Sequence, residues 1–150
     1  MVDQSAVGRA QRPYDMVVER GKIREFARAT FTRNSEYLDD PRPVSPTTFL
    51  ITSGFWSDPK DANLIASLDI DLARLLHGSQ EFVFHGPPPR AGTELTAQAR
   101  VDKVYEKEGR RGGTMTFVEI VTEFRDEQGN VSTETRSTLI VTGKAPEQER

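Results

Sequence analysis

The sequence predicts an α+β domain in which an antiparallel sheet is covered by helix. In the first half of the chain, apolar residues recur at helical spacing in two segments, 22–31 and 46–56. From residue 80 onward the sequence reads as one strand after another, with polar turn segments between them. The resulting order of strand, helix, helix and then a long antiparallel meander is typical of the α+β class.

The chain has 150 residues, which is the size of one ordinary domain. Both ends are polar and carry no apolar pattern that would hold them against a core. We therefore expect residues 1–12 to be a flexible amino terminus, residues 13–143 to form a single domain, and residues 144–150 to be a flexible tail.

Composition excludes several classes of protein. The chain has no cysteine, so disulfides, thiolate catalysis and cysteine-based metal sites are excluded. Charges of both signs are intermixed and the net charge is −3, so no basic patch predicts nucleic acid as a partner. Without a run of 18 apolar residues or a secretory signal, we expect no membrane span and a cytoplasmic location.

The first elements are a short strand over residues 14–18 and a helix from Lys22 to about Phe31. Apolar residues in this helix fall at positions i, i+3, i+4, i+7 and i+8, which places them on one stripe. The stripe consists of Ile23, Phe26, Ala27, Thr30 and Phe31.

A second helix is predicted from Pro46 to about Trp56. Ser45 can cap its free amides, and proline suits the first helical position. One face of this helix would then carry Phe49, Leu50, Ser53 and Trp56. Because this segment is rich in β-branched residues, a strand remains an alternative.

The second half begins with a strand at Gln80–His85, which a proline-rich turn ends. Apolar and polar residues alternate from Leu95 to Asp102, and the apolar parity shifts at Val104, which indicates a β-bulge. Residues 109–113 form a glycine-rich turn.

The closing strands follow that turn. Residues 115–124 are apolar on both faces, which is typical of a strand that is covered on both sides. Asp126–Asn130 is a hairpin turn, and Val131–Val141 returns along the preceding strand. Long antiparallel strands around one helix describe the hotdog fold, which is one member of the α+β class.

Three stretches of the sequence resemble the N-terminal-type domain of MaoC-like dehydratases, including the small subunits of actinobacterial (3R)-hydroxyacyl-thioester dehydratases. They are Gly21–Ala27 (GKIREFA), Val44–Leu50 (VSPTTFL) and Leu76–His85 (LHGSQEFVFH), the last followed by a proline-rich turn and Ala91–Leu95. With the closing strands, the resemblance covers roughly residues 14–142. It implies a hotdog fold, with an antiparallel sheet wrapped around a central α-helix.

The resemblance also implies a paired arrangement. In that family two hotdogs lie side by side, the acyl tunnel lies at their interface, and the catalytic half carries Asp and His in a motif like D-x-N-P-x-H. The comparable stretch here, Asn34–Pro41 (NSEYLDDP), lacks that motif, and no histidine follows until His77. The chain is therefore predicted to be the acyl-binding, non-catalytic half, which forms a homodimer or a heterodimer with a catalytic MaoC-like subunit.

This interpretation predicts no catalytic residue in the chain itself, with His77 and Asp39 as weak candidates. His77 also suits an edge or turn position, and Asp39 precedes proline in a turn-forming segment. No metal site and no cofactor are expected, and the substrate is an acyl-coenzyme A or acyl-carrier-protein thioester. The predicted substrate-binding residues are Thr47, Phe49, Trp56, Gly78 and Gln80.

Two other functions fit the same residues. The missing Asp–His motif also suits a non-enzymatic hotdog dimer that binds an acyl thioester or a lipid. A hotdog thioesterase ranks third, because that chemistry needs an acid to direct water near the central helix, and Pro46–Ser57 contains none. The choice between coenzyme A and carrier protein, and between homodimer and heterodimer, stays open at this point.

Overall fold

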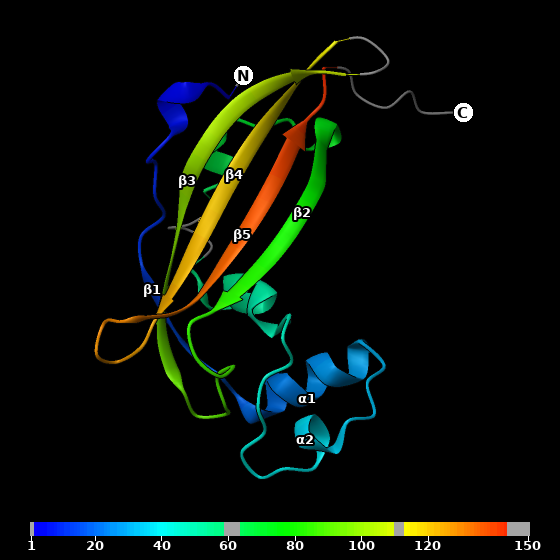
Figure 1. Cartoon of the computed structure of the whole chain (residues 1–150), viewed down its shortest axis with the longest axis vertical. Helices are drawn as coiled ribbons and strands as arrows, with labels where there is room; N and C mark the ends of the chain where they lie inside the picture. Colours follow the sequence, from blue (N-terminus) through cyan, green and yellow to red (C-terminus); the bar gives the residue numbers. More distant parts are fainter. Residues whose placement is uncertain (1, 59–63, 110–112, 144–150) are drawn as a thin grey trace.

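A single sheet of five antiparallel strands, in the order β1-β3-β4-β5-β2, dominates the computed structural model (Figure 1). The structure describes residues 2–58, 64–109 and 113–143. The strands are β1 (Tyr14–Val17), β2 (Leu75–Phe84), β3 (Glu94–Glu108), β4 (Thr114–Arg125) and β5 (Val131–Val141). Sheet and helices together confirm the predicted α+β class.

The helices are short, and all those in the described part of the chain precede the long strands β2 to β5. In Figure 1, α1 and α2 lie beyond one end of the long strands. The helical elements are η1 (Gln4–Ala6), α1 (Arg20–Ala29), α2 (Ser35–Leu38), η2 (Phe49–Trp56), η3 (Ala66–Leu68) and η4 (Leu72–Arg74), where η denotes a 3-10 helix.

Three residues of the predicted stripe of α1 face the protein interior, whereas Thr30 and Phe31 do not: they follow the end of the helix at Ala29, and Phe31 is 92% exposed. Ile23 and Ala27 are fully buried and Phe26 is half-buried. The helix begins two residues before the predicted start and ends at Ala29. It stops because Phe31 adopts a left-handed backbone conformation, with φ at +57°, which a right-handed helix cannot contain.

The central helix η2 differs from its prediction. The predicted α-helix over Pro46–Trp56 is wrong in type and in start, because the structure has a 3-10 helix over Phe49–Trp56. Ser45 does not cap it: the Ser45 amide instead donates to the Pro89 carbonyl at 2.9 Å. Residues with β-branched side chains, together with a glycine, lower the α-helical propensity of this segment, and a short 3-10 helix results.

The bulge and the hairpin turn of the meander agree with the sequence, whereas β2 begins at Leu75, five residues before the predicted start at Gln80. The register of β3 against β4 shifts between Val101 and Lys103, so the predicted bulge is confirmed. The hairpin turn is also confirmed, because the Asp126 carboxylate accepts hydrogen bonds from the amides of Gln128 and Asn130 at 3.0 and 2.8 Å. The predicted turn at 109–113 lies partly outside the described residues.

The outer face of β4 is covered by side chains of the sheet itself. Val121 is buried there, while Phe117 stacks on Tyr105 with ring centroids 5.1 Å apart. The Lys107 ammonium group lies 4.9 Å from the centroid of Phe117. Long side chains of neighbouring strands thus supply the cover that the two-sided apolar pattern predicted.

Buried apolar residues form two separate clusters on the helix-bearing face of the sheet. One lies under η2 and comprises Met16, Val18, Ile23, Phe49, Leu50, Ala91, Leu95, Ala97 and Phe124. The other lies farther along the strands and comprises Val2, Ala6, Leu64, Leu68, Ala99, Val101, Val104, Val118, Ile120 and Leu139.

The amino-terminal segment takes part in the second cluster, although the sequence predicts a flexible end up to residue 12. Val2 and Ala6 are buried there. The segment also runs along β3, since the amides of Gly8 and Gln11 donate to the carbonyls of Val101 and Ala99 at 2.9 and 2.8 Å. The packed domain therefore begins before residue 13. The predicted tail at 144–150 lies outside the described residues.

Candidate functional site

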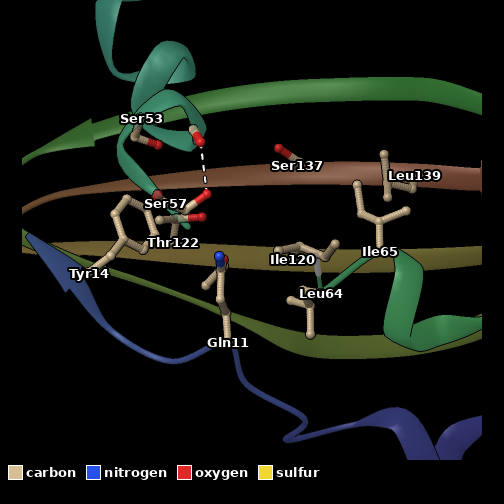
Figure 2. A pocket seen from close by; sticks show the side chains of 12 residues that line it. Gln11, Tyr14, Ser53, Ser57, Leu64, Ile65, Ile120, Thr122, Ser137 and Leu139 are labelled. Atoms are coloured by element: carbon tan, nitrogen blue, oxygen red, sulfur yellow. Dashed lines mark hydrogen bonds between the residues drawn. The ribbon is translucent and has the colours of Figure 1, made fainter. Parts of the chain in front are cut away.

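A cavity of about 480 Å³ lies between η2 and the sheet, where the two core clusters meet (Figure 2). Strands β1, β3, β4 and β5 contribute residues to it, and η2 and the segment after residue 63 complete it. The lining residues are Gln11, Tyr14, Ser53, Gly54, Ser57, Leu64, Ile65, Ala99, Ile120, Thr122, Ser137 and Leu139.

The two ends of the cavity differ in chemistry, as Figure 2 shows. Polar side chains gather at the end next to η2, where Tyr14, Ser53, Ser57 and Thr122 bring hydroxyl groups and Gln11 lies nearby. The other end is apolar and is lined by Leu64, Ile65, Ile120 and Leu139. Such a cavity suits an elongated molecule with oxygen atoms at one end and a hydrocarbon tail at the other.

The alternation of side chains along β5 explains why part of the cavity is lined by hydroxyl groups. Thr133, Thr135 and Ser137 occupy every second position, and the two threonines are buried. Because side chains alternate across a strand, these three hydroxyl groups face the helix while Glu134 and Arg136 face outward. The sheet therefore presents a polar strip to η2 in place of a continuous apolar surface.

Tyr14 is the titratable side chain of the cavity. Burial raises the pKa of its phenol above the ordinary value of 10.0, and a hydrogen bond with Ser53 opposes part of that rise. At neutral pH the phenol is therefore protonated and can donate a hydrogen bond to an oxygen atom in the cavity.

We expect the free energy of unfolding to fall as the pH rises above about 10. An unfolded tyrosine ionises near pH 10.0, whereas folded Tyr14 keeps its proton to a higher pH. The folded state then binds more protons than the unfolded state, so alkali lowers stability. Urea unfolding at pH 7.5 and pH 10.5 should show this loss in the wild type and a smaller loss in Tyr14→Phe; equal losses would contradict it.

The described lining contains no histidine, carboxylate, lysine or arginine. Hydroxyl and amide groups can bind an acyl thioester, but they cannot take a carbon-bound proton near neutral pH without a base beside them. The described lining therefore offers hydrogen-bonding groups and no general base for a carbon-bound proton.

The three predicted binding residues before and within η2 do not line this cavity. Thr47 is exposed ahead of the helix, Phe49 is fully buried and Trp56 is half-buried. The rings of Phe49 and Trp56 meet edge to face at 6.4 Å, and Phe49 meets Phe26 of α1 at 5.7 Å. These aromatic residues hold η2 between the sheet and α1.

The two predicted binding residues on β2 lie close to the cavity without lining it. Gln80 accepts a hydrogen bond from the hydroxyl of Ser137, which does line it. Gly78 has a packing role, because an added Cβ would lie 2.8 Å from Cδ1 of Ile140 on the neighbouring strand. A glycine thus allows β5 to approach where the β2 register shifts.

The weak catalytic candidates are both exposed and lie on different elements. His77 is on β2, and Asp39 ends α2. Neither lines the cavity. The neighbouring Asp40 carboxylate accepts a hydrogen bond from the Arg42 amide at 2.7 Å, as expected of a turn-forming segment.

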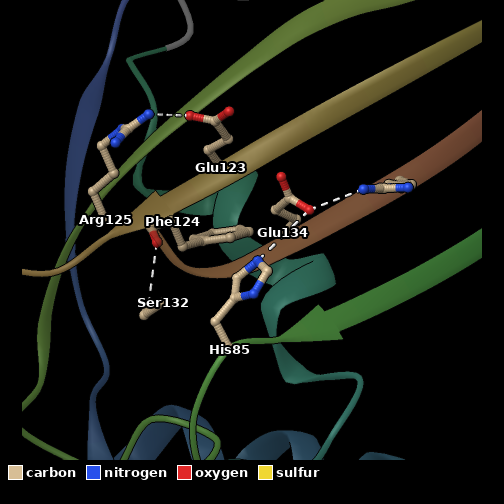
Figure 3. A network of polar contacts seen from close by, with 7 residues as sticks. His85, Glu123, Phe124, Arg125, Ser132 and Glu134 are labelled. Carbon is tan, nitrogen blue, oxygen red and sulfur yellow. Dashed lines mark hydrogen bonds and ion pairs between the residues drawn. The ribbon is translucent and has the colours of Figure 1, made fainter. Parts of the chain in front are cut away.

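The other histidine, His85, belongs to a surface network on the outer face of the sheet (Figure 3). Its Nε2 lies 3.8 Å from a carboxylate oxygen of Glu134, and Arg136 donates to the same carboxylate at 3.1 Å. This group of charges is separated from the cavity by the sheet, since Glu134 points away from η2.

Sequence reasoning missed Tyr14, Ser53, Thr122 and Ser137. They come from four elements that are distant in the chain, and no local motif joins them. The one available signal was the inward alternation of hydroxyl residues in β5.

Within the described ranges, no helix is long and apolar enough to cross a membrane. Nor do the described residues contain a group of three His, Cys, Asp or Glu side chains that could hold a metal ion.

Comparison with known proteins gives one family match and a set of similar folds. Residues 5–135 match the model of the FAS1-like dehydratase domain region. The chain is 32% identical to a UPF0336 protein of Streptomyces coelicolor, and the match covers 85% of this chain and 87% of that protein.

Two solved structures carry the same fold. One is a C-terminally truncated HadBC (3R-hydroxyacyl-ACP dehydratase) complex from Mycobacterium tuberculosis, with a TM-score of 0.70, 24% identity and coverage of 90% of this chain and 96% of that one. The other is a MaoC-like dehydratase, with a TM-score of 0.75, 21% identity and coverage of 91% of this chain but 42% of that one. These likenesses confirm the predicted hotdog fold.

Proposed function

Because this chain belongs to the family of the FAS1-like dehydratase domain region, we propose that it is the acyl-binding half of a MaoC-like (3R)-hydroxyacyl-thioester dehydratase. In this role it binds an acyl-coenzyme A or acyl-carrier-protein thioester. A second hotdog subunit supplies the Asp and His that move protons. The reaction is the reversible removal of water from a 3-hydroxyacyl thioester.

The observation that carries this proposal is a two-ended cavity whose described lining has no carboxylate, histidine, lysine or arginine. The hydroxyl groups at one end suit the thioester oxygen and the 3-hydroxyl group, and the apolar end suits the alkyl chain. Dehydration needs a base for the C2 proton and an acid for the departing hydroxyl group, and in this proposal a partner brings the base that the described lining lacks, together with the acid of its own motif.

The free edge of the sheet supports such a partnership. Among the residues that the structure describes, β2 is the last strand of the sheet and pairs only with β5, so its other side presents unpaired backbone groups there. The strand has no proline or lysine to block a neighbour, and Leu76 on it is 51% exposed. A second hotdog can extend the sheet by pairing with this edge.

A non-enzymatic acyl-binding dimer is the second candidate, and the same lining favours it. It predicts tight binding of an acyl thioester without turnover, even when a catalytic hotdog subunit is present. Hydrolysis of the thioester has less support, because the described lining offers no carboxylate to direct water.

Binding to the isolated chain tests the role of the cavity. Gly54 lines it, and a Cβ added there meets no atom within 4 Å, so Gly54→Phe can place a ring in the cavity with little strain. We expect hexanoyl-coenzyme A to bind the variant about tenfold more weakly or worse. Displacing two methylene groups, at about 0.8 kcal/mol each, accounts for that factor.

Gly86→Phe is the matched control, because a Cβ at Gly86 also meets nothing within 4 Å and that glycine lies outside the cavity lining. Calorimetric titration should give wild-type affinity for this variant. If the two variants bound hexanoyl-coenzyme A with equal affinity, the cavity would not be the acyl-binding site.

A further inference from the structure

A second cavity lies on the helix-bearing face of the sheet, at the end of the long strands that is away from η2. Its volume is about 640 Å³. The core cluster that lies farther along the strands supplies side chains to both cavities. Val2 of this cluster lines the second cavity, and Leu64 and Leu139 line the first. The cluster therefore lies between two cavities.

One inward-facing position of β4 separates the two cavities. Thr122 and Ile120 line the first cavity, and Thr116 lines the second. Val118 comes between them on the same face of the strand, is fully buried, and is absent from the described lining of both cavities. Val104 of β3 pairs with it and is buried in the same cluster. Because inward-facing residues recur about every 7 Å along a strand, the barrier is one side chain thick.

Two chain segments pass from one cavity to the other beside this position. They are residues 2–11 and residues 64–71, and each contributes to the lining of both cavities. Between those lining residues, Ala6 of the first segment and Leu68 of the second are buried in the same cluster. We call Ala6, Leu68, Val104 and Val118 the partition.

Hydrogen bonds hold these two segments in place. The carbonyl of Arg9 accepts a hydrogen bond from the Val101 amide of β3 at 2.9 Å, and its guanidinium group donates to the Ser67 carbonyl of η3. The amino-terminal segment thus connects β3 with η3, and Figure 1 shows it running beside β3. Ala6 and Leu68 are therefore fixed relative to the sheet.

The position of the partition limits the room for an acyl chain. With the thioester oxygen at the hydroxyl of Thr122, four residues of β4 remain before Val118, which is about 13 Å at 3.3 Å per residue. An extended hydrocarbon advances by slightly less than its bond length of about 1.5 Å per carbon, so about ten carbons fill this distance. Beyond the partition the lining includes Asp69, Arg74 and Glu106, which offer an alkyl chain little apolar contact.

We propose that the partition closes the acyl slot and sets the longest acyl chain that this protein binds with full affinity, at about ten carbons. The proposal rests on the proposed function and adds the length of its substrate. The residues of the partition act by excluding carbon atoms and do not contact the thioester. The amino-terminal segment and η3 are thereby assigned a part in substrate specificity.

The test measures the affinity of the full chain for butanoyl-, octanoyl-, decanoyl-, dodecanoyl- and tetradecanoyl-coenzyme A by calorimetric titration, at concentrations where they form no micelles. All five probes share one head group, so differences among them report on the alkyl chain. We expect wild-type affinity to rise about fourfold for each added methylene as far as decanoyl-coenzyme A, and to stay level or fall beyond it.

Leu68→Ala should move this limit to longer chains. The substitution removes three carbon atoms from the partition and makes room for about two more methylene groups of the substrate. We expect the variant to bind dodecanoyl-coenzyme A about tenfold more tightly than the wild type and to keep wild-type affinity for butanoyl-coenzyme A. Leu72→Ala is the matched control, because Leu72 lies on η4 and is 71% exposed. It should keep the wild-type dependence on chain length.

A second pair of variants tests the partition from the sheet. Val118→Ala should tighten binding of dodecanoyl-coenzyme A about fourfold, since it makes room for about one methylene group. Val121→Ala makes the same change on the same strand, at a buried position of the outer face. It should leave every affinity unchanged, and any effect of lowered stability alone would appear in it as well.

The outcomes separate this proposal from the proposed function. If none of the five thioesters binds the wild-type chain, the acyl-binding function itself fails. If they bind and wild-type affinity keeps rising through tetradecanoyl-coenzyme A, the partition does not close the slot. The proposal is equally wrong if Leu68→Ala and Val118→Ala keep the wild-type limit, or if the two control variants shift it by the same amount.

Discussion

The purified chain is expected to hydrate crotonyl-coenzyme A no faster than buffer does, and to become part of an active hydratase when a catalytic MaoC-like hotdog subunit is added. Positioned acid and base groups typically contribute about 10²- to 10⁴-fold to the rate of such a step. We therefore expect the complex to exceed the isolated chain by at least about 100-fold. The loss of absorbance of the enoyl thioester measures both rates.

Substitutions in each subunit test which of the two supplies the acid and base of the reaction. Replacing the Asp and His of the partner's D-x-N-P-x-H motif should return the mixture to the background rate without preventing its assembly. Gly54→Phe in this chain should raise the KM of the complex. A robust rate from the isolated chain would instead place the acid and base here and end the half-enzyme interpretation.

Much of the fold could be predicted because local patterns and tertiary contacts agree. Alternation from Leu95 to Asp102, a parity shift at Val104 and an aspartate-led hairpin at Asp126–Asn130 are each decided by neighbouring residues. The form of η2 could not be predicted in this way. Its apolar face fits a helix, whereas its β-branched residues do not. Packed between the sheet and α1, the segment forms a 3-10 helix.

The burial of the amino-terminal segment could not be predicted from local patterns either. Val2 and Ala6 belong to a short segment without the repeated apolar spacing of a helix or strand, so no local pattern marks them as buried. Their burial depends on β3, because the segment is held by hydrogen bonds to the carbonyls of Ala99 and Val101. Contacts between residues so far apart in the chain leave no periodic signal in the sequence.

The candidate site was harder to predict than the fold, because its residues are also far apart in the chain. Family resemblance directed attention to Thr47, Phe49 and Trp56, which lie within or beside one conspicuous motif. The cavity is instead lined by Tyr14, Ser53 and other hydroxyl residues that only the strand register brings together. A motif shows which residues are near one another in the chain, whereas a cavity is defined by residues that meet across the sheet.

Phe124→Ala is expected to cause one of the largest losses of stability available in this protein. Phe124 is fully buried on the η2-facing side of β4, in the cluster that also contains Phe49 and Ala97. Removing a buried phenyl ring typically costs about 3–5 kcal/mol, since apolar contact is lost and a cavity remains. Urea unfolding should show a lower midpoint at an unchanged dependence on denaturant.

Phe117→Ala is the control, because Phe117 lies on the same strand but on the outer face, where it is half-buried and stacked on Tyr105. An aromatic pair of this kind contributes about 0.5–1.5 kcal/mol beyond the area that it buries, and a half-buried ring loses less area than a fully buried one, so the loss should be smaller than that of Phe124→Ala. Equal losses would mean that the two faces of β4 are equally buried. The helix-bearing face could then no longer be distinguished as the side that holds the core and the cavity.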